Sequence, residues 1–291
     1  DVLTSRGLGD VYKRQTLMDG SRIVMTLGRE VSTKGSTFTI RRFRDEPFTP
    51  VDLLEFKTFS SMQIAFFWLA MQYGMSMLFV GGTASGKTTS LNACSLFLPW
   101  QHKIVSIEET RELNLPHPNW IPGCTRQGFG GESAGSGVKA AGEVDMYDLL
   151  RAALRERPEY IIVGEIRGAE AYVLFQAMAT GHTTYSTFHA DSIQSLVHRL
   201  ENKPIEIPRV LSPALDGISI QIQTRVGGKR VRRNKGIIEI IGIDPHSHEL
   251  LTNEAFRWDN TVDEFVFTGK SYIFEKIMMK ANLNRVEIMD E

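Results

Sequence analysis

A glycine-rich octapeptide between an apolar run and a helix-like segment constrains this chain more than any other feature. Residues 81–88 read Gly-Gly-Thr-Ala-Ser-Gly-Lys-Thr, which fits the pattern G-x-x-x-x-G-K-[ST]. The apolar run MSMLFV (75–80) precedes it, and TTSLNACSLFL (88–98) follows it. The glycines of this pattern let backbone N–H groups turn towards phosphate oxygens, and the next helix adds the positive end of its dipole. The context therefore predicts a nucleotide-binding loop that joins a buried strand to a helix.

Each residue of this loop has an expected role towards ATP and Mg²⁺. Lys87 is expected to reach the β- and γ-phosphates, and the Thr88 hydroxyl is expected to ligate Mg²⁺. The remaining residues offer backbone N–H groups to the phosphates. The candidate nucleotide-binding residues of the loop are Gly81, Gly82, Thr83, Ala84, Ser85, Gly86, Lys87, Thr88 and Thr89.

Short apolar runs alternate with helix-like segments through the middle of the chain. The runs KIVSI (103–107) and YIIV (160–163) join MSMLFV as predicted buried parallel strands. Strands that alternate with helices indicate an α/β domain with a mainly parallel sheet. After these elements, the runs at 235–243 and 254–259 predict a hairpin. Helical spacing predicts helices over 58–73, 146–157, 169–180 and 271–281.

The N-terminal part differs from this α/β pattern. The first residues, DVLTSRGLGDVYKRQ, show no helical or strand period and are interpreted as a non-native leader that packs poorly. The runs RIVMTL (22–27) and STFTIRRF (36–43) predict strands of a small, truncated α+β domain. Proline residues then mark a linker after these strands. Glycine residues mark a flexible loop much later in the chain, at 128–142. The expected divisions are a leader at 1–15, a domain remnant at 16–46, a linker at 47–57 and the P-loop domain at 58–291.

Acidic residues follow two of the apolar runs. Glu108 and Glu109 come after KIVSI, and Glu165 comes after YIIV and Gly164. The carboxyl ends of parallel strands meet in one crevice, so these acids are expected to face the loop. An acid there can serve the magnesium shell, partly through water, or orient the attacking water. Glu108 and Glu165 are candidates for both roles, and the sequence leaves the division between them open.

Composition excludes several other classes. The 33 basic and 34 acidic residues give a net charge of −1, and 42% of residues are hydrophobic. These values exclude a disordered chain and give no global attraction to nucleic acid. Two cysteines exclude a disulfide framework. No apolar run is long enough to cross a bilayer, so a cytoplasmic location is expected.

Four motifs in order resemble those of the type II/type IV secretion and pilus-motor ATPase superfamily, most closely its archaeal archaellum and pilus assembly branch. They are GGTASGKTT (81–89), IVSIEETREL (104–113), LLRAALRERPEYIIVGEIRG (149–168) and GHTTYSTFHADS (181–192). They resemble the family's Walker A, acidic box, arginine stretch with Walker B, and His box. The resemblance spans residues 20–270 and implies a RecA-like P-loop ATPase domain preceded by a small N-terminal domain.

The resemblance also implies a function. It implies a motor that couples Mg-ATP hydrolysis to domain motion in a hexameric homo-oligomer. The ring would act on an integral membrane platform protein at the inner face of the cell membrane. Glu165 matches the Walker B glutamate and Glu108 the acidic-box glutamate. The resemblance implies Glu165, Glu108, Lys87, Arg111 and His189 as catalytic residues, Thr88, Glu165 and Glu108 as magnesium ligands, and His182, Arg126 and Arg42 as further nucleotide contacts.

Two other functions compete with this interpretation. A nucleic-acid-translocating P-loop ATPase would use the basic run KRVRRNK (229–235) to follow phosphates. The flanking runs favour an exposed hairpin turn for this segment instead. A scaffold that binds nucleotide without hydrolysis is the second alternative.

The His-box segment 181–192 is polar and is interpreted as turn-like, with hydrogen-bonded loop histidines.

Overall fold

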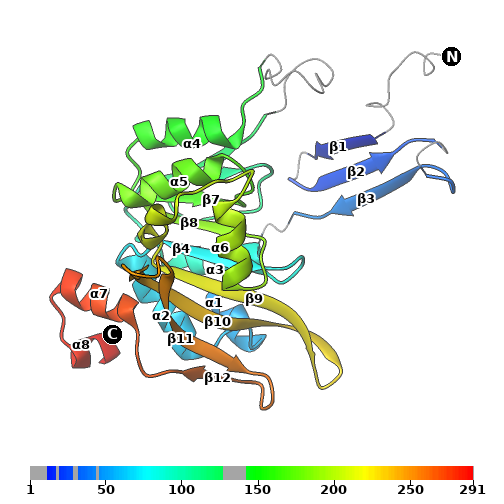
Figure 1. The fold of residues 1–291 in the computed structure, drawn as a ribbon. Helices are drawn as coiled ribbons and strands as arrows, with labels where there is room; N and C mark the ends of the chain where they lie inside the picture. The colour runs from blue at the N-terminus through cyan, green and yellow to red at the C-terminus, as the bar shows by residue number, and fades with distance from the viewer. Residues whose placement is uncertain (1–11, 18–19, 29–31, 44–45, 127–141, 291) are drawn as a thin grey trace.

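The computed structural model describes residues 12–17, 20–28, 32–43, 46–126 and 142–290. They form a nine-stranded sheet covered by helices and a separate three-stranded sheet near the N-terminus (Figure 1). The predicted flexible loop 128–142, except its last residue, lies outside the described residues, as do residues 1–11 of the expected leader.

The large sheet is parallel over its nucleotide-binding half. Its strands are β4 (Met77–Gly81), β5 (Ile104–Glu108), β6 (Trp120–Cys124), β7 (Tyr160–Val163), β8 (Thr183–Phe188), β9 (Gly217–Val226), β10 (Lys229–Ile243), β11 (Leu250–Asp259) and β12 (Glu264–Phe267). In the order β12-β11-β10-β9-β4-β8-β7-β5-β6, all neighbours from β9 to β6 pair in parallel. The three predicted apolar runs are strands of this half. The predicted α/β fold is confirmed.

The other half of the sheet is antiparallel and corrects one prediction. β9, β10, β11 and β12 follow one another as antiparallel neighbours. The predicted hairpin after residue 235 is therefore present as β10 and β11. The basic run KRVRRNK is not an exposed turn, because it forms the first half of β10. The turn lies just before it at Gly227 and Gly228, whose φ angles of 54° and 79° suit glycine.

Helices cover both faces of the sheet and bury two apolar cores. They are α1 (Pro50–Glu55), α2 (Ser61–Gln72), α3 (Lys87–Cys94), α4 (Met146–Arg155), α5 (Glu170–Ala179), α6 (Ile193–Glu201), α7 (Tyr272–Ala281) and α8 (Arg285–Asp290), with 3₁₀ turns at Ser95–Phe97 and Arg209–Ala214. Successive residues of β4 enter opposite cores: Met77 and Phe79 pack with α2 and α3, and Leu78 and Val80 with α4 to α6. Both cores thus hold the strand that leads into the loop.

Two further segments differ from their predictions. The His-box segment is not a turn, since Thr183–Phe188 forms β8 in the centre of the sheet, with Thr184 and Ser186 fully buried. The segment 47–57, expected as a linker, contains α1. Its N-cap Thr49 and Asp52 form a capping box, Pro50 occupies the first turn, and Leu53 packs in the core.

The N-terminal sheet lies to one side of the P-loop domain (Figure 1). Its strands are β1 (Tyr12–Thr16), β2 (Arg22–Thr26) and β3 (Thr37–Arg41), paired antiparallel in that order. β1 includes residues 12–15 of the expected leader, where the sequence shows no strand period. Neither apolar core includes a described side chain from β2 or β3. The described part of the chain has no helix that combines the length and apolarity needed to cross a membrane.

Candidate functional site

The glycine-rich loop leaves β4 and enters α3 with the geometry that its sequence predicts. A Cβ at Gly81 would lie 2.3 Å from the Gln221 carbonyl oxygen and 2.5 Å from Ser85 Oγ, so only glycine fits there. Gly86 caps α3 with a φ of 96°. Ala84 has a φ of 58°, which is unusual for a residue with a side chain and is typical of strained functional loops.

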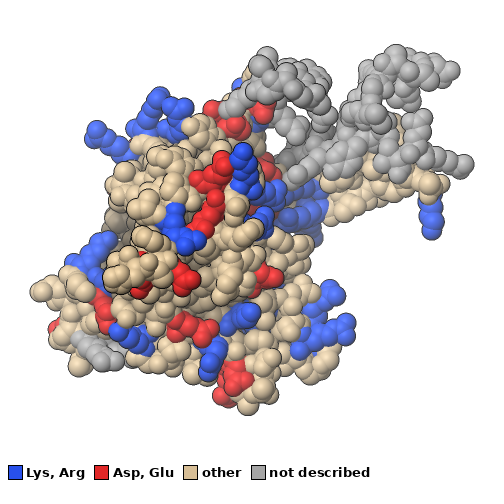
Figure 2. Space-filling view, in the orientation of Figure 1, with Lys and Arg blue, Asp and Glu red and all other residues tan. Residues whose placement is uncertain are grey.

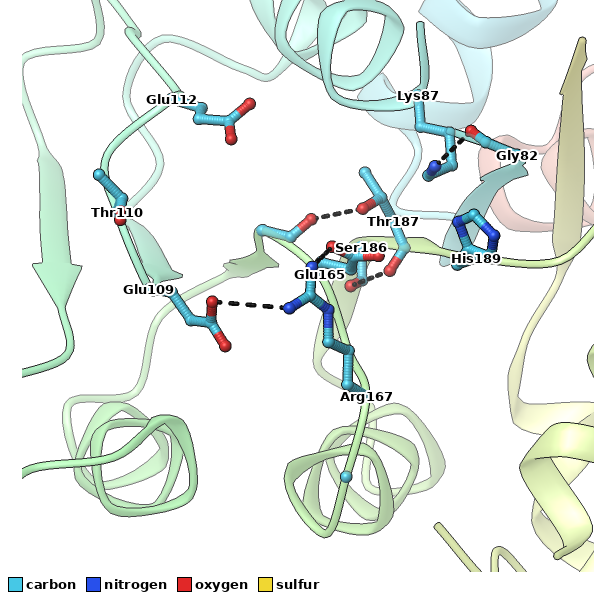
Figure 3. Close-up of polar contacts among 12 residues, drawn as sticks. Gly82, Lys87, Glu109, Thr110, Glu112, Glu165, Arg167, Ser186, Thr187 and His189 are labelled. Atoms are coloured by element: carbon cyan, nitrogen blue, oxygen red, sulfur yellow. Dashed lines mark hydrogen bonds and ion pairs between the residues drawn. The ribbon is translucent and has the colours of Figure 1, made fainter. Parts of the chain in front are cut away.

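Lys87 begins α3 and points back across the loop. Its Nζ donates to the Gly82 carbonyl oxygen at 2.9 Å (Figure 3). Burial lowers the pKa of Lys87, Glu165 opposes this effect, and Arg167 adds to it. A half-buried ammonium whose hydrogen-bond partner among the described residues is a neutral carbonyl is well placed to exchange that bond for an anionic ligand.

The loop opens onto a cavity of about 900 Å³. It is polar at the strand ends and apolar on the side of α1. The apolar wall contains Phe48, Leu53 and Phe56, and the rings of Phe48 and Phe56 meet edge to face at 5.3 Å. The polar lining includes Thr83 to Ser90, Glu108, Glu109, Glu112, Glu165, Arg167, Thr187, His189, Arg22, Arg41, Arg230 and Arg232. A cavity of this size with basic groups and a P-loop suits a nucleotide.

Glu108 ends β5 as a buried carboxyl group that is only 2% exposed. Its Oε1 accepts hydrogen bonds from the backbone N–H groups of Glu112 at 2.9 Å and Leu113 at 3.1 Å. Its Oε2 has no hydrogen-bond partner among the described residues. Burial raises the pKa of Glu108 to about 7, and the two backbone bonds oppose this shift.

Gly164 follows β7 at a point where the structure leaves little room for a side chain. A Cβ at this position would lie 3.1 Å from Glu108 Cγ, which is tighter than ordinary packing. The side chain of Glu108 from β5 therefore fills the space beside β7. The neighbouring strand also fixes this point, because Thr187 Oγ1 donates to the Gly164 carbonyl oxygen at 2.7 Å. The carboxyl group beside the end of β7 thus belongs to Glu108 of the adjacent strand β5.

Glu165 follows Gly164 and lies in a more open environment than Glu108 (Figure 3). Its side chain is 27% exposed and accepts a hydrogen bond from Arg167 Nη2. Arg167 Nη1 also lies 3.7 Å from Glu109 Oε2 at the end of β5. The ends of β5 and β7 are thus joined by one guanidinium between two carboxylates.

Two arginines of the N-terminal sheet reach this cavity through Glu112. Arg22 Nη2 lies 2.9 Å from Glu112 Oε1 and donates to the Thr110 carbonyl oxygen at 2.9 Å. Arg41 Nη2 donates to Glu112 Oε2 at 2.9 Å. Because Glu108 holds the backbone N–H of Glu112, the N-terminal sheet is linked to the end of β5.

The basic run of β10 also contributes to the cavity. Arg232 Nε donates to the Ala84 carbonyl oxygen of the loop at 2.9 Å. Arg233, next in the chain, turns the other way and binds Asp263 with both Nε and Nη2, at 2.7 and 2.8 Å. Arg230 lines the cavity beside Arg232.

The structure brings most predicted site residues together. Residues 83–89, Glu108, Glu165 and His189 all line the cavity. Gly81 and Gly82 precede the lining residues, and the Gly82 carbonyl oxygen accepts the hydrogen bond from Lys87. Four predicted contacts lie elsewhere. Arg111 stacks over Trp120, and with Arg42 it lines a second cavity of about 210 Å³ beside Thr88 and Thr89.

The other two predicted contacts lie outside both cavities. Arg126 donates to the Gly142 carbonyl oxygen, and His182 Nδ1 lies 3.5 Å from Thr180 Oγ1. Sequence reasoning also missed Arg22, Arg41, Glu112, Arg167, Arg230 and Arg232, which line the first cavity. Arg167 had a local signal, since it follows Glu165 in the motif GEIRG, whereas the arginines of β2, β3 and β10 are distant in sequence.

The fold and the loop define a P-loop ATPase domain of the RecA-like class. The sequence profile of the family described as type II/IV secretion system protein matches residues 19–289. This chain belongs to that family, the secretion and pilus-motor ATPases, and its archaeal relatives support the archaeal branch.

Protein MJ1287 of Methanocaldococcus jannaschii is 44% identical over 242 residues, 83% of this chain and 87% of that protein. Protein MJ0900 of the same organism is 44% identical over 268 residues, and the chain spans only 47% of its length. The type IV secretion system protein PtlH of Bordetella pertussis is 34% identical over 183 residues, 58% of this chain and 51% of PtlH.

Solved structures show the same fold at lower identity. The pilus retraction motor PilT with bound ADP has a TM-score of 0.53 and 19% identity over 96% of this chain and 69% of PilT. The ATPase DotB of Legionella pneumophila has a TM-score of 0.52 and 20% identity over 76% of this chain and 60% of DotB. At these identities the likeness concerns the fold.

Proposed function

We propose that this chain is an ATP-hydrolysing motor subunit of a secretion, pilus or archaellum assembly machine. The observation that carries the proposal is the meeting of Lys87, Thr88 and Glu165 in one cavity at the carboxyl ends of β4 and β7. Membership of the secretion ATPase family supports the same activity. Three groups from two strand ends supply phosphate binding, a magnesium ligand and an acid, as phosphoryl transfer to water requires.

The lining suggests how ATP lies in the cavity. The phosphates would meet the N–H groups of residues 82–89 and the Lys87 ammonium, where the helix dipole of α3 favours negative charge. The base would lie against Phe48, Leu53 and Phe56. His189 and the arginines of β2, β3 and β10 surround the polar end and offer charge to the transferred phosphoryl group.

The oxygen donors beside the loop fit a magnesium ion. Thr88 lines the cavity, and Glu108 Oε2 is buried without a hydrogen-bond partner among the described residues. Hydroxyl and carboxylate oxygens are the ligands that Mg²⁺ accepts, directly or through water. When bound, Mg²⁺ would neutralise charge that develops on the phosphate oxygens.

The two glutamates have different roles in this proposal. Glu165 is partly exposed in the cavity and has one carboxylate oxygen that no described side chain occupies, so we assign it to orient the attacking water. Glu108 uses Oε1 to hold the loop 109–113, and its raised pKa of about 7 reflects deep burial. Glu108 therefore serves the magnesium shell and the shape of the site.

The contacts of the N-terminal sheet offer a way to couple hydrolysis to motion. Arg22 and Arg41 bind Glu112, and both line the cavity. Phosphates would compete with Glu112 for these guanidinium groups and draw the sheet over the cavity. A hexameric ring would pass this motion to a membrane platform protein at the cytoplasmic face, as we infer from family membership.

The nucleic-acid translocase is less consistent with the side-chain contacts. Within the basic run, Arg233 pairs with Asp263 and Arg232 binds the P-loop, so these two contacts do not form a track for nucleic acid. Basic and acidic side chains are also mixed over the face shown in Figure 2. Such a surface lacks the basic stripe that phosphate tracking needs.

The proposal is tested by ATP hydrolysis of the purified 291-residue chain, with Lys87→Ala as the matched variant. We expect magnesium-dependent turnover that falls at least 100-fold in the variant, because the β- and γ-phosphates lose their ammonium partner. Light scattering with and without ATP would follow assembly, and a hexamer is expected with nucleotide. Binding of ATP without turnover would instead favour the non-hydrolysing scaffold. Turnover that requires single-stranded nucleic acid would favour the translocase.

A further inference from the structure

Arg167 lies between two carboxylates at the edge of the cavity and has no role in the function proposed above. Figure 3 shows its guanidinium group between Glu165 and Glu109. Its Nη2 donates to Glu165 Oε2, and its Nη1 lies 3.7 Å from Glu109 Oε2. Within the described ranges, Arg167 is the one side chain that pairs with the Glu165 carboxylate.

The backbone that carries Arg167 is itself fixed. Glu170, the first residue of α5, accepts hydrogen bonds at Oε1 from the backbone N–H of Arg167 at 2.6 Å and of Gly168 at 2.8 Å. Both N–H groups lie before the N-cap of α5, Ala169, so Glu170 fixes the turn that leads into the helix. The guanidinium is thus anchored through its backbone by Glu170 and through its side chain by Glu109.

We propose that Arg167 is a positioning residue that sets the orientation of the Glu165 carboxylate, with Glu109 as its second anchor. The inference rests on the proposed role of Glu165 in orienting water. Arg167 occupies Oε2 of Glu165, so Oε1 is left for the water. A carboxylate on a flexible side chain loses catalytic effect when it samples many rotamers, and a charged hydrogen bond restricts them.

The geometry favours arginine over lysine at this place. A planar guanidinium presents separate N–H groups to two carboxylates at once, whereas an ammonium is a point charge that serves one of them well. The pairs are also half-exposed: the side chain of Arg167 is 59% exposed and that of Glu109 is 47% exposed. Ion pairs at such exposure add little to folding stability. Loss of Arg167 is therefore expected to affect turnover and to leave folding intact.

The experiment is a double-mutant cycle on the full 291-residue chain. Arg167→Gln is expected to lower kcat about 10- to 100-fold while KM for ATP and Kd for ADP change less than about threefold. Arg167→Lys is expected to recover part of kcat, and Glu109→Gln to lose a smaller part. The variant Glu165→Gln/Arg167→Gln is expected to turn over no more slowly than Glu165→Gln alone, because Arg167 acts through Glu165. Arg257→Gln, which removes an exposed arginine of β11, is the matched control.

Several results would overturn the inference. Unchanged or faster turnover of Arg167→Gln, in a protein inactivated by Glu165→Gln, would show that Arg167 does not position the acid. A further loss in the double variant would assign Arg167 a role independent of Glu165. Weaker ADP binding would make it a nucleotide contact, and a lower melting temperature in parallel with kcat would make it structural. Full turnover of Glu165→Gln would overturn the proposed role of Glu165, and the inference with it.

Discussion

The ends of β5 and β7 carry the same type of residue at the same edge of one sheet, yet they make different environments. Glu108 on β5 is buried, bonded to two backbone N–H groups and has a pKa raised to about 7. Glu165 after β7 is partly exposed and bonded to a side chain. Burial and the kind of hydrogen-bond donor thus separate a carboxyl group that shapes the site from one that can act on substrate.

The strongest test of this difference is Glu165→Gln. We expect kcat for ATP to fall on the order of 100-fold or more, because an amide cannot accept the proton of the attacking water. Binding of ADP should change less than about threefold, since Glu165 is not expected to hold the nucleotide. Steady-state hydrolysis together with ADP titration checks both. Glu264→Gln, exposed on β12, is the control, and equal losses from the two substitutions would contradict the comparison.

A smaller effect is expected on stability when Glu108 is replaced by Gln. The folded protein holds a proton on Glu108 up to a pKa of about 7, against 4.5 for the ordinary group, so Glu108 favours folding fully below pH 4.5 and loses that contribution as the pH rises through 7. Glu108→Gln keeps an acceptor for both N–H groups and removes this titration. The stability of the wild type relative to the variant should therefore fall by about 2–3 kcal/mol between pH 5 and pH 8.

Urea unfolding of the magnesium-free protein with EDTA at both pH values measures this change. Parallel changes in the wild type and Glu108→Gln would show that Glu108 titrates as an exposed acid. Such parallel changes would also contradict the proposed difference in environment between Glu108 at the end of β5 and Glu165 after β7.

The smallest effect is expected from Gly164→Ala, which tests how closely the two ends are packed. The added Cβ would lie 3.1 Å from Glu108 Cγ, so Glu108 must shift or β7 must move. We expect a loss of about 1–2 kcal/mol of unfolding free energy. Gly242→Ala on β10 is the control, because a Cβ there meets nothing within 4 Å. Equal unfolding midpoints for the two variants would mean that Gly164 leaves more room than its contacts indicate.

The sequence predicted what depends on neighbours along the chain. The loop at 81–88, the strands before it and before Glu108 and Glu165, and the helices at 146–157 and 169–180 have strong local patterns and are present. β8 was missed because its Thr and Ser residues look like a turn. In the sheet the hydroxyl groups of Thr183, Ser186 and Thr187 donate to backbone carbonyl oxygens. Thr184 Oγ1 is buried without a hydrogen-bond partner among the described residues.

Predictions failed where partners lie far apart in the sequence. The runs on either side of KRVRRNK favoured an exposed turn, but the segment is part of β10, where Asp263 and the P-loop carbonyl of Ala84 pair with Arg233 and Arg232. Arg22 and Arg41 reach the cavity through Glu112, 90 and 71 residues away in the chain. No local pattern could show these contacts, because they exist only once the sheets are assembled.

The link between Glu112 and the two arginines has a mechanical consequence. The described side chains of β2 and β3 are not part of the two apolar cores, and Arg22 and Arg41 join this sheet to Glu112 and the Thr110 carbonyl of the P-loop domain. Apolar contacts resist separation strongly, whereas ion pairs near the surface weaken with salt, and Arg41 in this link is 66% exposed. The junction is therefore a compliant hinge whose stiffness is set by ionic strength and by whichever anion the two guanidinium groups hold.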